Sequence, residues 1–137
     1  MGNKKILIVE DDADVRLGYK ILLTAHHYDT FFAGDAITAI SEAVMHQPDL
    51  ILLDLGLPAG DGFIVLERFR ANMNLALIPV IVVSARDLKE DKERALKAGV
   101  KGFIKKPWND DQLLALIKRL LGQRDPLVLN RMAGHWQ

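Results

Sequence analysis

Short apolar runs alternate with longer segments of helical periodicity along this chain, and this alternation constrains the fold more than any other feature. Each run is too short for a helix, and most are rich in the β-branched or aromatic residues that strands favour. Three runs are continuously apolar, which is typical of parallel strands covered on both faces. The five predicted strands are KILIV (5–9), YDTFFA (28–33), LILL (50–53), PVIVV (79–83) and GFI (102–104).

The segments between these runs carry apolar residues at helical spacing. Two of them open with the capping-box spacing, Asp87 with Glu90 and Asn109 with Gln112, and a glycine follows each. Five strands that alternate with five helices predict a three-layer α/β domain, a doubly wound (βα)5 fold with a parallel sheet. The predicted helices cover 12–26, 35–46, 61–71, 87–98 and 109–121.

Composition excludes several other classes of protein. Half of the 137 residues are hydrophobic, which is enough for a core at this length. Basic and acidic residues both number 18, which argues against a nucleic-acid-binding surface over the whole domain. Disulfides and thiolate metal sites are excluded because there is no cysteine. No apolar run approaches the roughly 20 residues of a membrane span or the ~7–15 of a signal peptide, so we expect a cytoplasmic protein without a membrane segment.

Acidic, hydroxyl and basic residues stand at the ends of four predicted strands. Glu10 and Asp11 follow the first strand, and Asp54 follows the third. Ser84 ends the fourth strand, and Lys106 comes just after the fifth. In doubly wound sheets, ligands bind beyond the carboxyl ends of the strands. We therefore expect these side chains to meet at one rim of the domain.

Such a rim has the groups that phosphoryl transfer needs. Two like charges about 4 Å apart cost about 4 kcal/mol at an effective dielectric constant near 20, so grouped carboxylates require a cation. Oxygen ligands with a phosphate partner favour Mg²⁺. The lysine and the hydroxyl would bind other oxygens of the phosphoryl group. Asp54 is then the in-line nucleophile, and the product is an aspartyl phosphate.

Four motifs, in order, give the chain its resemblance to a known family. They are ILIVEDD, ILLDLGLPAGDG, VIVVSA and GFIKKPW. Together they resemble the receiver domain of bacterial two-component response regulators, with a chemotaxis-regulator-like pattern. The resemblance covers residues 4–122 and leaves 123–137 as a C-terminal tail or linker. It implies a flavodoxin-like sheet in the order 2-1-3-4-5. A stand-alone receiver and the N-terminal receiver of a larger regulator are not distinguished.

The resemblance also implies roles for the acidic residues. Asp54 matches the phosphoacceptor and is also a metal ligand. Asp11 is expected to bind Mg²⁺ directly, and Glu10 is expected to bind it through water. The backbone carbonyl two positions after the phosphoacceptor, that of Gly56, completes the expected metal site.

Three further residues match positions that act on the phosphoryl group or respond to it. Lys106, just before Pro107, matches the lysine that binds a phosphoryl oxygen. Ser84 matches the hydroxyl position and Phe103 the aromatic switch position. The implied response is that Ser84 turns to a phosphoryl oxygen and Phe103 fills the vacated space. This movement would alter the surface formed by residues 87–121.

The resemblance implies a phosphorylation-controlled signalling switch. A sensor histidine kinase or a phosphotransfer protein would donate the phosphoryl group in a Mg²⁺-dependent reaction. The domain would catalyse its own phosphorylation and dephosphorylation without being an enzyme with a separate substrate. Partners or a second copy of the chain would bind the 87–121 surface. No DNA binding is expected, because no helix-turn-helix fits in the 15 residues after 122.

Other interpretations stay open at this point. An aspartyl-nucleophile phosphatase usually carries a second acid two residues after the nucleophile, where this chain has Gly56. A flavodoxin-like cofactor binder needs a Gly-, Ser- or Thr-rich loop after the first strand, where this chain has EDDAD. A receiver-like scaffold that is never phosphorylated has no need of the full set of rim residues. Ser84 could simply bond the backbone, and Phe103 could be plain core.

Overall fold

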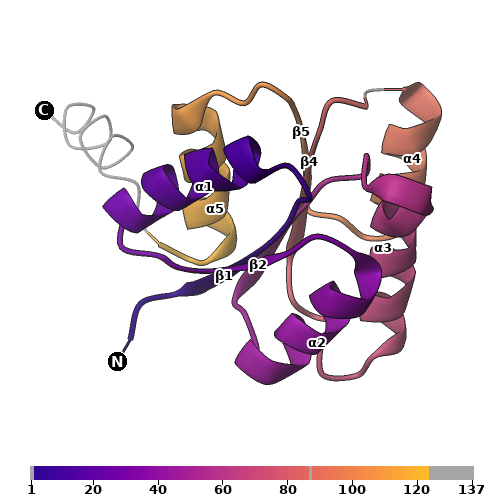
Figure 1. Cartoon of the computed structure of the whole chain (residues 1–137), viewed down its shortest axis with the longest axis horizontal. Coiled ribbons are helices and arrows are strands. Elements are labelled where there is room, and N and C mark those ends of the chain that lie inside the picture. Colours follow the sequence, from indigo (N-terminus) through magenta and orange to yellow (C-terminus); the bar gives the residue numbers. More distant parts are fainter. Residues whose placement is uncertain (1, 87, 124–137) are drawn as a thin grey trace, which may run out of the picture.

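A computed structural model describes residues 2–86 and 88–123 of the chain. Five strands form one parallel sheet in the order β2-β1-β3-β4-β5, with helices on both faces (Figure 1). The strands are β1 (Lys5–Val9), β2 (Asp29–Ala33), β3 (Leu50–Leu53), β4 (Val80–Ser84) and β5 (Gly102–Lys105). The α-helices are α1 (Ala13–Ala25), α2 (Ala36–His46), α3 (Asp61–Ala71), α4 (Lys89–Lys97) and α5 (Asp110–Leu120). The predicted three-layer, flavodoxin-like fold and its strand order are confirmed.

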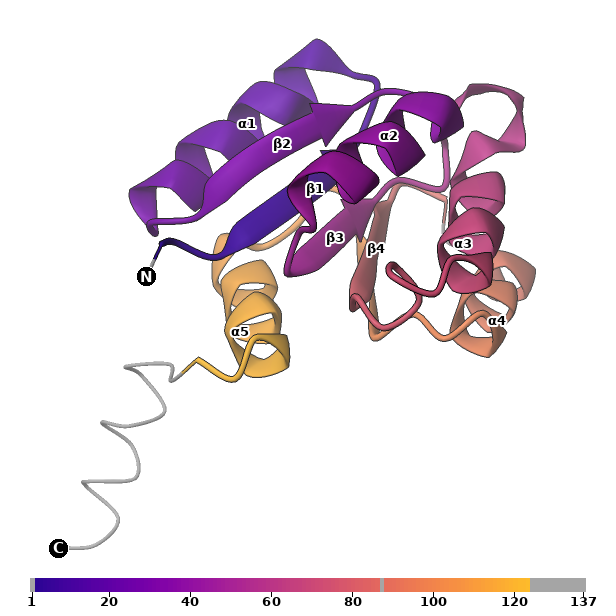
Figure 2. The same cartoon turned by 90° about the horizontal axis from the view of Figure 1, so that it is seen from below.

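The sheet separates two apolar cores. Helices α1 and α5 cover one face, and α2, α3 and α4 cover the other (Figures 1 and 2). Because successive side chains of a strand point to opposite faces, neighbouring residues enter different cores. Ile6 and Ile8 pack under α1 and α5, whereas Leu7 and Val9 pack on the side of α2, α3 and α4. The continuously apolar strands are therefore explained by burial on both sides.

Polar caps stand where α1 and α5 begin, and the one at α5 was predicted from its capping-box spacing. Asp12 precedes α1, and its carboxylate accepts hydrogen bonds from the backbone N–H groups of Asp14 and Val15 at 2.8 and 3.1 Å. Asn109 precedes α5 and accepts from Gln112 N–H at 3.0 Å. Both caps follow strand ends, so the helix N-termini lie at the same rim as the strand-end residues.

The structure differs from the sequence predictions in two loops. Helix α4 begins at Lys89 and its N-cap is Leu88, which makes no side-chain capping bond, so the capping box predicted from Asp87 does not start this helix. Asp87 itself lies outside the described residues. A short 3₁₀ turn, η1 (Pro58–Gly60), precedes α3 and was not predicted. The predicted tail, 123–137, lies outside the described residues beyond Gln123.

Across residues 2–86 and 88–123, no helix combines the length and the apolar character that a bilayer span requires.

Candidate functional site

The rim residues are held in place by the hydrogen-bond ladder of the sheet. Glu10 N–H donates to the carbonyl of the last residue of β2 at 2.8 Å, and Asp54 N–H donates to that of β1 at 3.0 Å. Lys106 N–H likewise donates to the carbonyl of Ser84, the last residue of β4, at 3.0 Å. Each backbone is thus fixed although each residue lies just past its strand. Three segments far apart in sequence therefore present their side chains at one edge.

Three carboxylates converge at this edge. Oxygens of Glu10, Asp11 and Asp54 lie within 4.8 Å of one another. Glu10 is 2% exposed and Asp54 is 8% exposed, whereas Asp11 faces solvent. A set of oxygen ligands that offers no nitrogen or sulfur suits a hard divalent cation such as Mg²⁺. The predicted meeting of acids from the first and third strands is confirmed by this geometry.

Lys106 reaches across the rim to the same acids. Its ammonium Nζ donates to Glu10 Oε1 and, at 3.2 Å, to Asp54 Oδ2. The lysine follows β5, and β4 separates that strand from β3, so the long side chain spans the width of an intervening strand. One positive charge therefore balances part of the charge of the three acids. The cluster still carries more negative than positive charge and attracts a cation.

Burial and charge together shift the ionisation of this cluster. Burial raises the pKa of Glu10 above its usual value; the negative charge of Asp54 adds to the rise, and the hydrogen bond from Lys106 opposes it. Burial by itself would lower the pKa of Lys106, but the hydrogen bond to Glu10 and the charge of Asp54 outweigh it, so this pKa is raised. Lys106 therefore stays a cation at neutral pH.

Ser84 is completely buried at the end of β4, the strand between those that carry Asp54 and Lys106. Its hydroxyl oxygen accepts a hydrogen bond from Arg86 N–H at 3.2 Å. Phe103 lies on β5, half-buried against the core under α2, α3 and α4, with the Lys92 ammonium 5.5 Å from its ring centre. The structure thus places both predicted switch residues on the strands that flank the rim.

The backbone of Gly56 lies close to the carboxylate of Asp54. Its backbone N–H donates to Asp54 Oδ1 at 2.8 Å. A Cβ atom at position 56 would lie 3.3 Å from that oxygen, which is closer than ordinary van der Waals contact. The glycine therefore keeps the Asp54 carboxylate approachable from this side. The predicted role of the Gly56 carbonyl as a metal ligand stays a prediction.

Two residues support the site in ways that sequence reasoning did not find. The Arg16 guanidinium donates to the backbone carbonyl of Glu10 and so fixes the turn between β1 and α1. Tyr19 stacks on Trp108, with ring centres 4.1 Å apart and planes 10° from parallel. Burial, and then the charges of Glu10 and Asp54, raise the pKa of the Tyr19 phenol, which stays neutral. Tyr19 is buried, and the periodicity of its helix carries no signal for a stacking partner 89 residues away.

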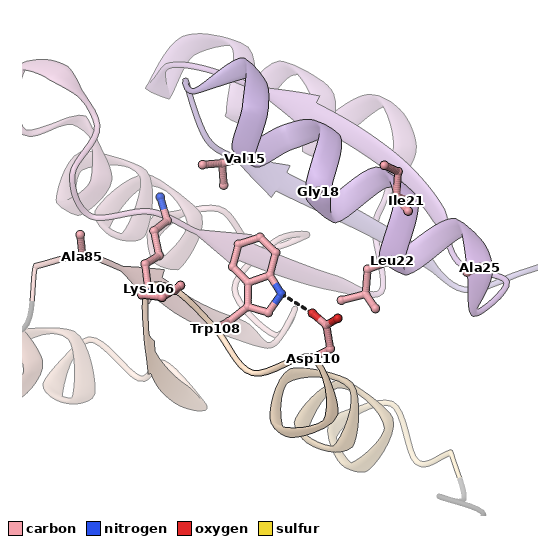
Figure 3. A pocket seen from close by; sticks show the side chains of 10 residues that line it. Val15, Gly18, Ile21, Leu22, Ala25, Ala85, Lys106, Trp108 and Asp110 are labelled. Atoms are coloured by element: carbon pink, nitrogen blue, oxygen red, sulfur yellow. Dashed lines mark hydrogen bonds between the residues drawn. The ribbon is translucent and has the colours of Figure 1, made fainter.

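An apolar groove opens beside Lys106, between α1 and α5 (Figure 3). It encloses about 770 Å³, and Trp108 forms part of its wall while its indole N–H donates to Asp110 Oδ1 at 2.9 Å. The exposed side chain of Ile21 lies on the opposite wall. Trp108 is partly exposed in this position. The groove and the acidic cluster share Lys106.

Comparison with known proteins agrees with the fold. A family model described as the response regulator receiver domain matches residues 6–118. The chain belongs to the response regulator receiver family. As a receiver domain, it is 37% identical over 121 residues to the DNA-binding dual master transcriptional regulator RpaA of Synechocystis, covering 88% of this chain and 50% of that protein. It is 31% identical over 129 residues to the phosphate regulon transcriptional regulatory protein PhoB of Escherichia coli, covering 94% and 56%. The chain thus spans about half the length of these relatives.

Solved receiver structures superpose closely on this one. The receiver domain of a sensor histidine kinase from Pseudomonas aeruginosa is 30% identical, has a TM-score of 0.81, and covers 89% of this chain and 100% of its own. That structure has a magnesium ion coordinated in its active site cleft. A CheY-like receiver domain protein from Methanospirillum hungatei is 29% identical with a TM-score of 0.82, covering 88% and 95%.

Proposed function

We propose that this receiver domain is a Mg²⁺-dependent phosphoacceptor switch with Asp54 as its phosphorylated residue. One observation carries the proposal: the carboxylates of Glu10, Asp11 and Asp54 lie within 4.8 Å of one another, and the Lys106 ammonium lies 3.2 Å from Asp54. A nucleophile, a cation site and a fixed positive charge are thereby grouped in one place. Phosphoryl transfer depends on this kind of positioning and charge stabilisation.

The chemical step forms an acyl phosphate. A carboxylate oxygen of Asp54 attacks the phosphorus of a phosphohistidine in a sensor histidine kinase or a phosphotransfer protein. The new P–O bond forms as the P–N bond breaks, and the imidazole leaves with the electron pair of that bond and takes up a proton. Lys106 stabilises the charge on one phosphoryl oxygen, and the hydroxyl of Ser84 donates to another. Gly56 has no side chain to stand between the Asp54 carboxylate and the incoming group.

Glu10, Asp11, Asp54 and the Gly56 carbonyl would hold the Mg²⁺ ion. Their oxygen chemistry and close spacing fit a small hard cation that keeps several waters. When bound, the ion neutralises the clustered acids and the charge of the phosphoryl group. Asp11 is exposed and so provides the solvent-facing side of this site.

The output of the switch is a change in the surface formed by residues 87–121. Asp54 phosphorylation adds negative charge at the rim, next to the strand that carries Ser84. Ser84 would turn to the phosphoryl group, and Phe103 would move inward behind it. Helix α4, which contacts Phe103 through Lys92, would then present a different face to a partner or to a second copy of the chain.

The test is intact-mass measurement after incubation with acetyl phosphate, with and without Mg²⁺. The wild type is expected to gain one phosphoryl group when Mg²⁺ is present, and Asp54→Asn is expected to gain none. Asp12→Asn is the matched control, because it changes an acid two positions from Glu10 but keeps a good helix cap. Equal labelling of Asp54→Asn and the wild type would overturn the assignment.

A further inference from the structure

Asp91 is an acid of α4 that is nearly removed from solvent. It is 8% exposed, while its neighbours Glu90 and Lys92 face solvent. The guanidinium of Arg86 forms a bidentate ion pair with the Asp91 carboxylate. Nε donates to Oδ2 at 3.1 Å, and Nη2 donates to Oδ1 at 3.2 Å. Paired, planar bonds of this kind are stronger and more directional than single ones.

This pair differs from two other ion pairs of α4 in the burial of its acid: the Asp91 side chain is 12% exposed, while that of Arg86 is 45% exposed. Lys89 and Glu93 approach at 3.9 Å and both are well exposed. The Arg94 pair with Glu67 is 3.6 Å long, with side chains 60% and 70% exposed. Exposed pairs of this kind contribute little. A buried carboxylate that loses its partner is costly, so the Arg86 pair holds the first turn of α4 to the loop after β4.

Arg86 is also bonded to the predicted switch hydroxyl. Its backbone N–H donates to Ser84 Oγ at 3.2 Å. A hydroxyl can accept one hydrogen bond while it donates another, so Ser84 can keep this bond and donate to a phosphoryl oxygen. If Ser84 turns toward Asp54, the Arg86 backbone must follow it or lose a partner for its N–H. The Arg86 side chain then transmits the displacement to Asp91.

We propose that Arg86 is a positioning residue that couples the Ser84 hydroxyl to helix α4 through its paired contact with Asp91. This inference rests on the proposed function, since it names the link between Asp54 phosphorylation and the 87–121 surface. Lys92, next to Asp91, lies over the ring of Phe103, so the same turn of α4 contacts the second switch residue. Movement of this turn would thus reach both the helix and β5.

The test compares backbone amide NMR shifts on addition of beryllium fluoride, a phosphoryl mimic, with Mg²⁺. In the wild type we expect shifts at Ser84 and along α4, for example at Ala95. In Arg86→Gln, and in the double variant Arg86→Gln/Asp91→Asn, the shift at Ser84 should persist and the shifts along α4 should fall at least twofold. Both members of the pair are neutral in the double variant, so no unpaired charge is buried and the domain is expected to fold. Dispersed amide signals in its NMR spectrum check that it does. Lys89→Gln, which removes one positive charge from α4 itself, is the control and should keep the full response.

The outcomes separate two failures. Full α4 shifts in the folded double variant would overturn the coupling role of Arg86 and leave the proposed function intact, since the pair would then be a structural brace. A wild-type chain that responds nowhere to beryllium fluoride with Mg²⁺ would overturn both. If the Arg86–Asp91 pair were only structural, its removal would lower the free energy of unfolding without changing the ratio of the α4 shifts to the Ser84 shift.

Discussion

A single lysine ammonium bonds two carboxylates at the rim. Lys106 donates to both Glu10 and Asp54, so its removal leaves two close acids without that compensation. Lys106→Met is expected to slow phosphorylation by acetyl phosphate by roughly 10²-fold, the effect of losing one preorganised charge-stabilising donor. The rate is read from intact mass against time. Lys105→Met, at the neighbouring exposed position, should keep the wild-type rate. Equal rates for the two variants would contradict this role for Lys106.

The positions of Glu10 and Asp54 could be predicted because each directly follows an apolar run. Strand ends at one edge of a parallel sheet are set by topology, and the ladder bonds of these residues keep them there. Asp91 could not be predicted in this way. It lies in a strongly charged helix whose faces are expected to be solvated, and its burial depends on Arg86 in the preceding loop. Periodicity within one helix carries no signal for such a partner.

At the scale of elements, two glycines in helices predict opposite responses to the same substitution. A Cβ on Gly62 in α3 would lie 2.6 Å from Leu55 Cα and 2.8 Å from the Asp54 carbonyl oxygen. Because these are backbone atoms, Gly62→Ala is expected to lower the free energy of unfolding by about 1–3 kcal/mol. A Cβ on Gly18 in α1 would meet the Trp108 ring at 3.8 Å, ordinary contact. Gly18→Ala is expected to raise the free energy of unfolding by about 0.5–1 kcal/mol.

Urea denaturation measures both glycine variants on the same scale. Their difference in sign is the result to be tested, since the two share a side-chain change and differ in the space around it. A gain in stability from Gly62→Ala would mean that α3 packs less closely against the loop after β3 than described.

Two helix caps predict different dependences of stability on pH. The hydrogen bond from Thr38 N–H lowers the pKa of Asp35, the N-cap of α2, below its ordinary value of 3.8. A lowered folded-state pKa gives stability that is present above the unfolded value and lost as pH falls through the folded one. The stability difference between Asp35→Ala and the wild type should therefore shrink below about pH 4.

Asn109, the N-cap of α5, is the control because an amide does not titrate in this range. Asn109→Ala should cost about 1 kcal/mol at both neutral and acidic pH. Urea unfolding midpoints of the wild type, Asp35→Ala and Asn109→Ala, measured across pH 3–7, compare each variant with the wild type. A constant cost for Asp35→Ala down to pH 3 would show that its carboxylate charge plays no part in the cap.

The bounds of α3, 61–71, were predicted to the residue, and those of α1 and α5 to within one residue at each end. Helix bounds were predicted worst at α4, where the capping-box spacing pointed to Asp87 but the helix begins after Leu88. Local spacing competes there with a tertiary contact, the bond from Arg86 to Asp91, which ties the first turn to the loop after β4. The η1 turn was missed because Ala59 adopts a positive φ of 59°, which its residue type does not favour.

At the scale of the whole molecule, the proposed cation site predicts that stability depends on divalent cations. A ligand that binds the folded state alone stabilises it by about 2.7 kcal/mol at 100 times its dissociation constant. Saturating Mg²⁺ is expected to raise the free energy of unfolding by an amount of this order, measured in urea at matched ionic strength. Asp11→Asn should lose most of this gain. Asp14→Asn, an exposed acid on the first turn of α1, should keep it. Equal gains in both variants would place the cation elsewhere.

The two cores on either side of the sheet have a consequence for how this domain tolerates change. Enlarging or trimming Ile8 disturbs the layer of α1 and α5, while the same edit one residue later, at Val9, disturbs the layer of α2, α3 and α4. The β-sheet separates the two cores, so the helices on each face pack against a different set of buried residues. A substitution in one core is therefore expected to disturb the helices packed on that core and to leave the helices of the other layer in place.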